Sequence, residues 1–135
     1  MSIPEWGTVR DCMSTNVTEV DGRMDILTAM KVMKKVGSTS VIVKRRDEQD
    51  EYGLLLFADI AKQVIAKNRA PERVAVYEIM AKPVLMVRPE MRIRYCARFF
   101  EKFGISHAPV IEDDKIIGMV SYYRLMLHGL PDLDD

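Results

Sequence analysis

The sequence predicts an α/β fold made of two copies of one β-α-β-β-α unit. The 135-residue chain is 48% hydrophobic and 30% charged, a composition typical of a folded domain. When the chain is aligned with itself at a spacing of 67 residues, nine of the 35 pairs between Val9–Val43 and Val76–Val110 are identical. Both copies also show the same order of strand-like and helix-like apolar patterns. We therefore expect two repeats, one over residues 8–66 and one over residues 74–130.

Each repeat is predicted to open with a short strand that follows a Met-x-x-x-Val motif. The strands are expected at Val17–Val20 and at Val84–Val87. A turn follows each strand, at Asp21–Gly22 in the first repeat and at Arg88–Pro89 in the second, because Gly and Pro favour turns.

An amphipathic helix follows the turn in both repeats. Its apolar residues recur at steps of three or one along the chain and so trace one face of an α-helix. Gly37 and Gly104 end the two patterns, where a left-handed C-terminal cap favours glycine. The predicted core face consists of Ile26, Ala29, Met30, Met33 and Val36 in the first repeat and of Ile93, Cys96, Ala97, Phe100 and Phe103 in the second.

Two strands and a closing helix complete each repeat. The strand pairs are predicted at Ser40–Lys44 with Tyr52–Leu56, and at His107–Glu112 with Lys115–Val120. Asp113–Asp114 supplies a tight turn in the second pair. The closing helices are expected to begin near Phe57 and near Ser121, with a core face in the first repeat formed by Ile60, Ala61, Val64 and Ile65. The charged run Arg45–Glu51 is predicted to be a solvated hairpin tip.

Charge and cysteine content argue against several classes of function. With 20 basic and 20 acidic residues, the chain has no net charge to attract nucleic acids or anionic membranes at long range. The basic helix face of Lys31, Lys34 and Lys35 is only a modest candidate for nucleic acid. Cys12 and Cys96 form no Cys-x-x-Cys pair, which argues against a disulfide scaffold and a zinc site. The first residues do not resemble a signal peptide and no apolar run reaches the ~18 residues of a membrane span, so we expect a cytoplasmic protein with no membrane partner.

These motifs resemble those of the CBS (cystathionine-β-synthase) domain. The resemblance rests on Met-x-x-x-Val-x-x-Val, the helix that ends in Gly, Ser-x-x-Pro-Val-Ile at Ser106–Ile111, and Ile-x-Gly-x-Val-x-x-x-x-Leu at Ile116–Leu125. It covers residues 8–128 and implies a stand-alone Bateman module, in which tandem CBS domains pack about a pseudo-twofold axis. It also implies a cleft that binds an adenine nucleotide, namely AMP, ADP or ATP, and less often NAD or S-adenosylmethionine.

The resemblance further implies where such a nucleotide would be held. In the family, Gly-h-x-[Thr/Ser]-x-x-Asp leads into the closing helix, with its hydroxyl toward phosphate or ribose and its Asp toward the ribose hydroxyls. The first repeat keeps Asp59 but has Leu56 at the hydroxyl position, whereas the second keeps Ser121 but has Arg124 in place of Asp. We expect a ribose-facing first repeat and a phosphate-facing second repeat. The implied contacts are Asn16, Val17, Thr18, Ser40, Asp59, Pro83, Val84, His107, Ala108, Pro109, Ser121 and Arg124.

Each of these residues also has an ordinary structural interpretation. Asp59 could simply compensate a helix dipole, Ser121 could be a plain N-cap, and Arg124 could be solvated. His107 has neither a second His nor a carboxylate at metal-ligand spacing. No acid–base pair, nucleophile elbow or P-loop occurs, so we expect no enzyme and no catalytic cofactor. Two functions stay open: a sensor of an adenine nucleotide that signals to an unidentified regulated protein, and a structural dimerisation module with degenerate ligand sites.

The sequence also predicts a homodimer. Val32 and its counterpart Phe99 lie roughly 90° from the core face of their helices at 100° per residue, yet both are apolar. A matched pair on two equivalent helices indicates a second buried surface, and CBS pairs commonly form dimers through these helices. The predicted interface is apolar and closes under twofold symmetry.

Overall fold

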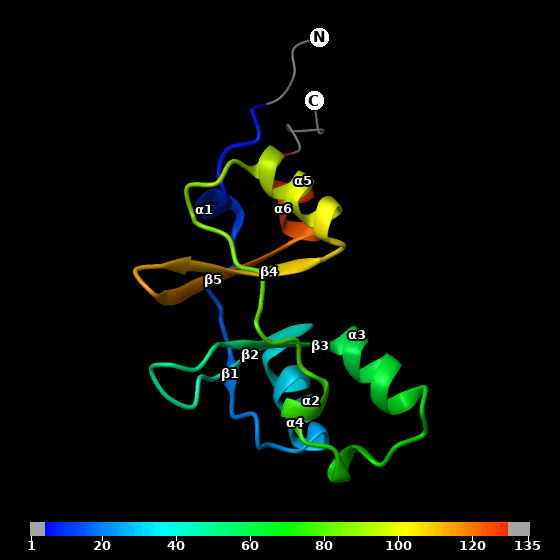
Figure 1. Cartoon of the computed structure of the whole chain (residues 1–135). Helices are drawn as coiled ribbons and strands as arrows, with labels where there is room; N and C mark the ends of the chain where they lie inside the picture. The colour runs from blue at the N-terminus through cyan, green and yellow to red at the C-terminus, as the bar shows by residue number, and fades with distance from the viewer. Residues whose placement is uncertain (1–4, 130–135) are drawn as a thin grey trace. The chain divides into compact units, whose positions relative to one another are not determined.

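The chain folds into two compact units of mixed helix and strand (Figure 1). The computed structural model describes residues 5–129. Unit 2 is the continuous segment Thr18–Val84, whereas unit 1 combines the chain up to Val17 with the chain from Leu85 onward. The α/β class predicted from the sequence is therefore confirmed, and the two units are equivalent in the order of their elements.

Each unit contains the opening segment of one sequence repeat and the remainder of the other. Helix α1 (Val9–Cys12) belongs to unit 1, and helix α4 (Val76–Ile79) belongs to unit 2. The sequence does not predict these helices, because four residues are too few to show a helical period. The hydrogen bonds that join the exchanged segments are equivalent and both 2.8 Å long: Val9 N to Met91 O, and Val76 N to Met24 O.

Unit 2 is built on a three-stranded sheet in the order β1 (Glu19–Val20), β2 (Ser40–Val43) and β3 (Gly53–Leu56). β1 runs parallel to β2, and β2 runs antiparallel to β3. Helices α2 (Ile26–Val36) and α4 lie on one face of this sheet (Figure 1). The core beneath that face contains Val20, Ile26, Ala29, Met33, Val41, Val43, Leu55, Ile60, Val64, Val74 and Val76.

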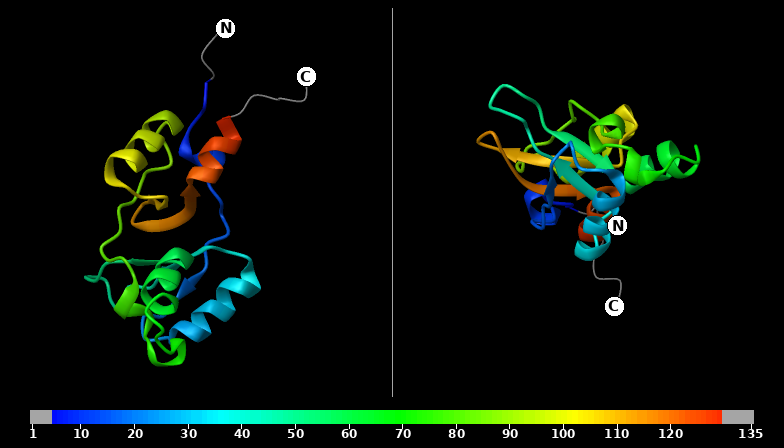
Figure 2. Two further views of the ribbon diagram at one scale, coloured as in Figure 1. Left: turned by 90° about the vertical axis from the view of Figure 1, so that its right-hand side faces the viewer. Right: turned by 90° about the horizontal axis from the view of Figure 1, so that it is seen from below.

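Unit 1 is built on the antiparallel hairpin of β4 (His107–Glu112) and β5 (Lys115–Ser121). Helices α1, α5 (Ile93–Phe103) and α6 (Tyr122–Gly129) lie on one face of the hairpin, as two directions of view agree (Figures 1 and 2). Its core contains Val9, Cys12, Val87, Ile93, Cys96, Phe100, Ala108, Val110, Val120 and Leu125.

The predicted helix ends and the predicted tight turn are confirmed. Gly37 and Gly104 adopt left-handed φ angles of 68° and 63° at the C-caps of α2 and α5. Asp113 and Asp114 adopt φ angles of 51° and 64° between β4 and β5. Asp tolerates this conformation better than most residues, and two successive positive φ angles match the twist of a two-residue hairpin turn.

The first strand of each repeat is shorter than predicted. In the first repeat only Glu19–Val20 pair with β2. In the second repeat Val87 alone forms a parallel bridge, to Val110. Pro83 directly precedes the predicted strand and has no backbone N–H to donate to a ladder, which limits pairing at that end.

The predicted core faces of the helices are wrong at their ends. Val36 is 48% exposed and Phe103 is 50% exposed, since both lie in the last turn beside the cap glycine. After α3 (Phe57–Ile60) the chain winds as a π-helix, η1 (Ala61–Ile65), in which Ala66 N donates to Ala61 O at 2.8 Å. This wider turn changes the angular spacing of the side chains, so Val64 is buried while Ala61 is exposed and Ile65 is 65% exposed. A short 3-10 helix, η2 (Pro71–Arg73), precedes α4.

Candidate functional site

In unit 2 the predicted ligand residues lie at the end of the sheet where α3 begins. Ser40 pairs with Leu56 across β2 and β3, and Thr18 O accepts a hydrogen bond from Ile42 N at 2.9 Å. Asp59 lies in the first turn of α3, where its carboxylate accepts a weak bond from Leu56 N at 3.3 Å. The structure therefore places Thr18, Ser40 and Asp59 on elements that meet at one end of the sheet.

In unit 1 the predicted residues gather where β5 leads into α6. His107 and Ser121 are direct cross-strand partners in the hairpin. Ser121 Oγ accepts a hydrogen bond from Arg124 N at 3.3 Å, which makes Ser121 an N-cap of α6. Ala108 and Pro109 follow His107 on β4 and are buried.

Arg124 is held within unit 1. Its Nη1 atom donates to the carbonyl of Cys12 at 3.4 Å, at the C-terminal end of α1. The negative end of a helix dipole stabilises a positively charged guanidinium at this place. Arg124 is exposed to solvent and in addition has this one structural partner.

The His107 imidazole is half-buried, and burial lowers its pKa. Its Nδ1 lies 2.8 Å from Ser106 Oγ. Because desolvation disfavours the imidazolium, His107 is predominantly neutral at pH 7. A neutral imidazole donates or accepts a hydrogen bond but adds no positive charge toward a phosphate.

The remaining predicted residues lie on the segments that connect the units. Asn16 is exposed and its N–H donates to Ser14 Oγ at 3.3 Å, while Val17 is half-buried. Pro83 is exposed and Val84 is half-buried, just after the bridge between Leu54 and Ala81.

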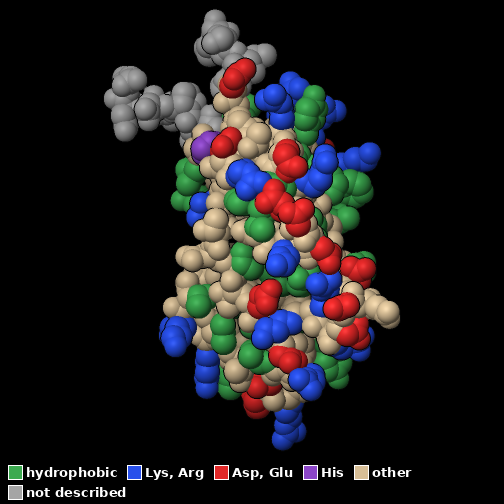
Figure 3. Space-filling model, turned by 90° about the vertical axis from the view of Figure 1, so that its left-hand side faces the viewer, with side chains coloured by type: hydrophobic (Ala, Val, Ile, Leu, Met, Phe, Trp, Pro, Cys, Tyr) green, Lys and Arg blue, Asp and Glu red, His purple; other side chains and the backbone are tan. Residues whose placement is uncertain are grey.

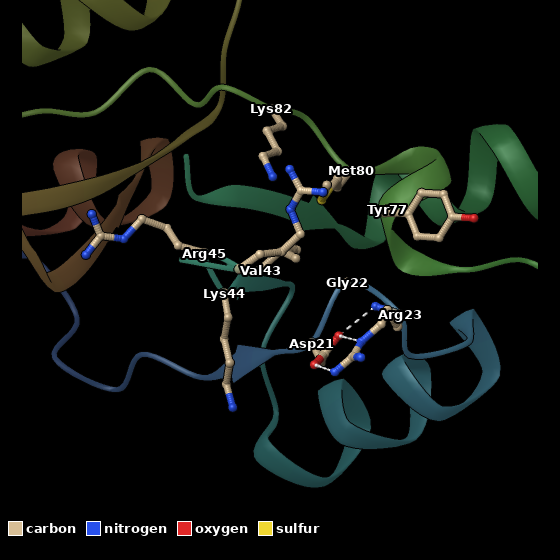
Figure 4. Close-up of a pocket in the computed structure, with 10 residues that line it drawn as sticks. Asp21, Gly22, Arg23, Val43, Lys44, Arg45, Tyr77, Met80 and Lys82 are labelled. Carbon is tan, nitrogen blue, oxygen red and sulfur yellow. Dashed lines mark hydrogen bonds and ion pairs between the residues drawn. The ribbon is translucent and has the colours of Figure 1, made fainter. Parts of the chain in front are cut away.

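Unit 2 also contains a pocket of about 680 Å³ that the sequence does not predict (Figure 4). It lies at the opposite end of the sheet from Asp59, where β1 and β2 end. Three segments line it: the turn Asp21–Arg23, the strand end and loop Val43–Arg46, and Tyr77, Met80 and Lys82 on or after α4. Five of its lining residues are basic and one is acidic.

An ion-pair network forms one wall of this pocket. Lys82 Nζ lies 2.9 Å and Arg46 Nε lies 3.1 Å from the same Asp50 oxygen, Oδ2. The Asp50 side chain is only 8% exposed, so the expectation of a wholly solvated hairpin tip is wrong at this residue. Lys82, together with the backbone and side chain of Arg46, holds the pKa of Asp50 well below its usual range. On the floor, the guanidinium of Arg23 lowers the pKa of Asp21 to about 2.

The sequence does not predict this ion-pair network, because Asp50 and Lys82 are 32 residues apart. The adjacent Arg45 and Arg46 were the available signal, and in a hairpin loop they are typical of a solvated surface. The exchange of α4 into unit 2 brings Lys82 to the hairpin, and nothing in a single sequence predicts that exchange.

The described residues hold neither a candidate metal centre nor a candidate membrane-spanning helix. Across residues 5–129, no group of three or more His, Cys, Asp and Glu side chains is placed to hold a metal ion. None of the helices within that range has the length and apolarity needed to cross a membrane. On the face shown in Figure 3, basic and acidic side chains are interspersed.

Comparison with known proteins decides the family. The family model of the CBS domain matches residues 9–66 and 76–129. The chain belongs to the CBS domain family. The two matched stretches correspond to the two repeats found by aligning the sequence with itself, and together they cover most of the chain.

Curated relatives share the CBS pair but are longer. A homoserine O-acetyltransferase of Methanosalsum zhilinae is 34% identical over 114 residues, which are 84% of this chain and 22% of that protein. The mitochondrial CBS domain-containing protein CBSX3 of Arabidopsis thaliana is 28% identical over 125 residues, which are 84% of this chain and 60% of that protein. The chain thus spans less than two thirds of either relative.

Solved CBS proteins share the fold. The hexameric CBS-CP12 protein from bloom-forming cyanobacteria is 36% identical with a TM-score of 0.86, over 88% of this chain and 69% of that one. The CBS domain pair of protein MJ0100, in complex with 5′-methylthioadenosine and S-adenosyl-L-methionine, has a TM-score of 0.75 over 89% of this chain and 93% of that one. Because the identity is 24%, this comparison shows a shared fold and no more.

Proposed function

We propose that this protein is a non-catalytic regulatory CBS pair that binds an adenine nucleotide, AMP, ADP or ATP, and signals to a partner protein. One observation carries the proposal: Ser121 and His107 face each other across the hairpin at the start of α6, with Arg124 one turn on. A helix N-terminus presents free N–H groups and a partial positive charge to an anion. A hydroxyl, an imidazole and a guanidinium around it suit a phosphate.

The ribose is assigned to unit 2. One oxygen of the Asp59 carboxylate accepts a weak hydrogen bond from Leu56 N at 3.3 Å. The carboxylate has further lone pairs that can accept from other donors. Two adjacent ribose hydroxyls are such donors. In this proposal Asn16, Val17, Thr18, Ser40, Pro83, Val84, Ala108 and Pro109 line the adenine. The MJ0100 pair supports the ligand class, since a protein of this fold holds two adenosyl compounds.

The second candidate is a structural dimerisation module. It is favoured by the incomplete motifs, because neither closing helix carries both a hydroxyl and an Asp. Phe99 is half-buried against its own core, and its ring centroid lies 4.8 Å from that of Phe103, which is 50% exposed. We propose that these rings, with Val32 on α2, form the homodimer surface. The CBS-CP12 protein from bloom-forming cyanobacteria, which is hexameric, supports this proposal.

Titration calorimetry with AMP, ADP, ATP, NAD and S-adenosylmethionine distinguishes the two candidates. The sensor predicts that one adenine nucleotide binds and that Asp59→Asn weakens it about tenfold, as expected for losing one charged hydrogen-bond acceptor. Glu78→Gln is the matched control, because Glu78 accepts from Ala75 N at 2.7 Å in the first turn of α4, outside the motif. Absence of binding by all five compounds at millimolar concentration would favour the structural module.

A further inference from the structure

The pocket at the hairpin end of unit 2 carries a concentrated positive charge. Its basic side chains come from three separate segments: Arg23 from the turn after β1, Lys44, Arg45 and Arg46 from the end of β2, and Lys82 from the segment after α4. Asp21 and Asp50 provide the carboxylates in and behind the lining. Lys44 and Arg45 also line a neighbouring pocket with the acidic residues Glu19, Asp47 and Glu48, which leaves Arg23, Arg46 and Lys82 against Asp21 and Asp50, an excess of one positive charge.

Lys82 and Arg46 show how strongly the cations converge. Both approach the same oxygen of Asp50, so two positive charges share one negative charge. The Lys82 side chain is only 24% exposed and extends into the pocket (Figure 4). Like charges held this close repel, and the repulsion is relieved when a further anion binds.

The equivalent positions of unit 1 show that the fold does not require this charge. At the spacing of 67 residues, the five basic residues correspond to two glutamates, an aspartate, an isoleucine and a threonine. These are Glu90, Ile111, Glu112, Asp113 and Thr15. Arg10 there forms an ion pair with Glu112, which neutralises one of the acids. The five basic residues of the pocket are therefore not repeated at the equivalent positions of unit 1.

The floor and rim of the pocket suit a ligand larger than a single ion. Gly22 forms the floor of the pocket. A Cβ atom added to Gly22 would lie 3.3 Å from Val43 Cγ1 and 3.6 Å from Tyr77 Cβ. The equivalent residue of unit 1 is Pro89, which is buried. Tyr77 is 59% exposed at the rim and presents an aromatic ring (Figure 4). A volume of about 680 Å³ lies within the range of small-molecule sites.

We propose that this pocket binds a phosphorylated small molecule, separately from the nucleotide assigned to the motif residues. Its phosphoryl groups bind Lys82, Arg46 and Arg23, since guanidinium and ammonium groups form strong charge-assisted bonds to phosphate. The uncharged part of the molecule packs on Tyr77 and on the side chain of Met80. The site makes unit 2 respond to a second, anionic signal.

Calorimetry with inorganic pyrophosphate at low ionic strength tests the anion site. The wild type is expected to bind, and the double variant Arg46→Gln/Lys82→Gln to bind at least about tenfold more weakly, the loss expected for one charged hydrogen bond. Lys31→Gln/Lys34→Gln removes the same charge from the exposed face of α2 and should change the affinity less than about twofold, because exposed charges are screened.

Four further variants keep the test decisive. Arg23→Gln/Lys44→Gln leaves the Asp50 network intact and should also weaken pyrophosphate binding, even if Arg46→Gln/Lys82→Gln fails to fold. Asp50→Asn removes the internal counter-ion and should strengthen binding. The proposal is overturned if pyrophosphate does not bind, or if Arg124→Gln abolishes binding while both pocket variants retain it. Asp59→Asn should leave pyrophosphate unaffected, so failure of the nucleotide site is separately visible.

Discussion

Gly118 of β5 lies directly against the sulfur of Met13, a residue that belongs to the other sequence repeat. A methyl group at Gly118 would lie 2.7 Å from Met13 Sδ and 2.9 Å from the carbonyl oxygen of Ser14. Gly53 of β3 stands in the same relation to Met80, with 2.6 Å to Sδ and 3.4 Å to Ala81 O. The Met of one CBS motif therefore packs on the Gly of the other, which explains why each unit needs both repeats.

Alanine at these two glycines should destabilise the fold unequally. Gly118→Ala is expected to lower the free energy of unfolding by about 1–3 kcal/mol, the usual result of overpacking. Gly53→Ala should be milder, because its nearest backbone atom, Ala81 O, would lie at 3.4 Å rather than at 2.9 Å, and Val43 Cβ at 3.1 Å needs to move only slightly. Urea denaturation of both variants measures the difference. Equal stability of Gly118→Ala and the wild type would contradict the close packing.

Asp50 should make the hairpin loop sensitive to acid. Its pKa is depressed in the folded state by Lys82 and Arg46, so its contribution to stability is present above the unfolded pKa and lost as the pH falls through and below that value. Asp50→Asn is expected to melt below the wild type at pH 7, and the two melting temperatures should converge in acid. Asp47→Asn, at an exposed position of the same loop, is the control. A constant difference across pH would contradict this role.

His107 should change stability in the same direction as Asp50, but near neutral pH. Burial lowers its folded pKa, so the unfolded state binds more protons and stability falls as the pH drops below about 6.5. His107→Gln should flatten that part of the stability curve. The other histidine of the chain, His128, is exposed, and His128→Gln should leave the slope unchanged. Parallel curves for wild type and His107→Gln would show that burial does not govern this imidazole.

Ser121 should have a structural and a ligand-binding effect that separate. Ser121→Ala removes the N-cap of α6 and is expected to lower stability by about 1 kcal/mol, whereas Ser121→Asp keeps the cap. Asp would repel a phosphate, so Ser121→Asp should remain stable yet lose nucleotide affinity. Melting curves and ATP titration of both variants test this. If Ser121→Asp binds ATP like the wild type, the phosphate does not lie at α6.

The homodimer has a simple test in sedimentation analysis. The wild type is expected to sediment as a dimer at micromolar concentration, and Phe99→Asp or Phe103→Asp as a monomer, because both place a charge in the proposed apolar surface. Phe57→Asp is the control, since Phe57 is 56% exposed at the start of α3 and is not one of the residues of the proposed surface. A monomeric wild type would contradict the proposed dimer.

Much of the fold follows from the sequence because its strongest signals are periodic or conformational. The repeat, the apolar period of α2 and α5, and glycines that require positive φ are all local in the chain. The exchange of α1 and α4 is not local, and a four-residue helix leaves no periodic trace. The same difference between local and long-range signals separates the motif residues from the basic pocket. Asp59 and Ser121 are marked by their motif, whereas the pocket depends on Lys82 reaching Asp50 across 32 residues.

A crystal structure of the protein grown with ATP tests the central claim most directly. We expect phosphate density beside Ser121 and Arg124 and ribose density within hydrogen-bond distance of the Asp59 carboxylate. ATP bound only in the pocket of Arg46 and Lys82, or density at neither place with ATP in saturating excess, would contradict it.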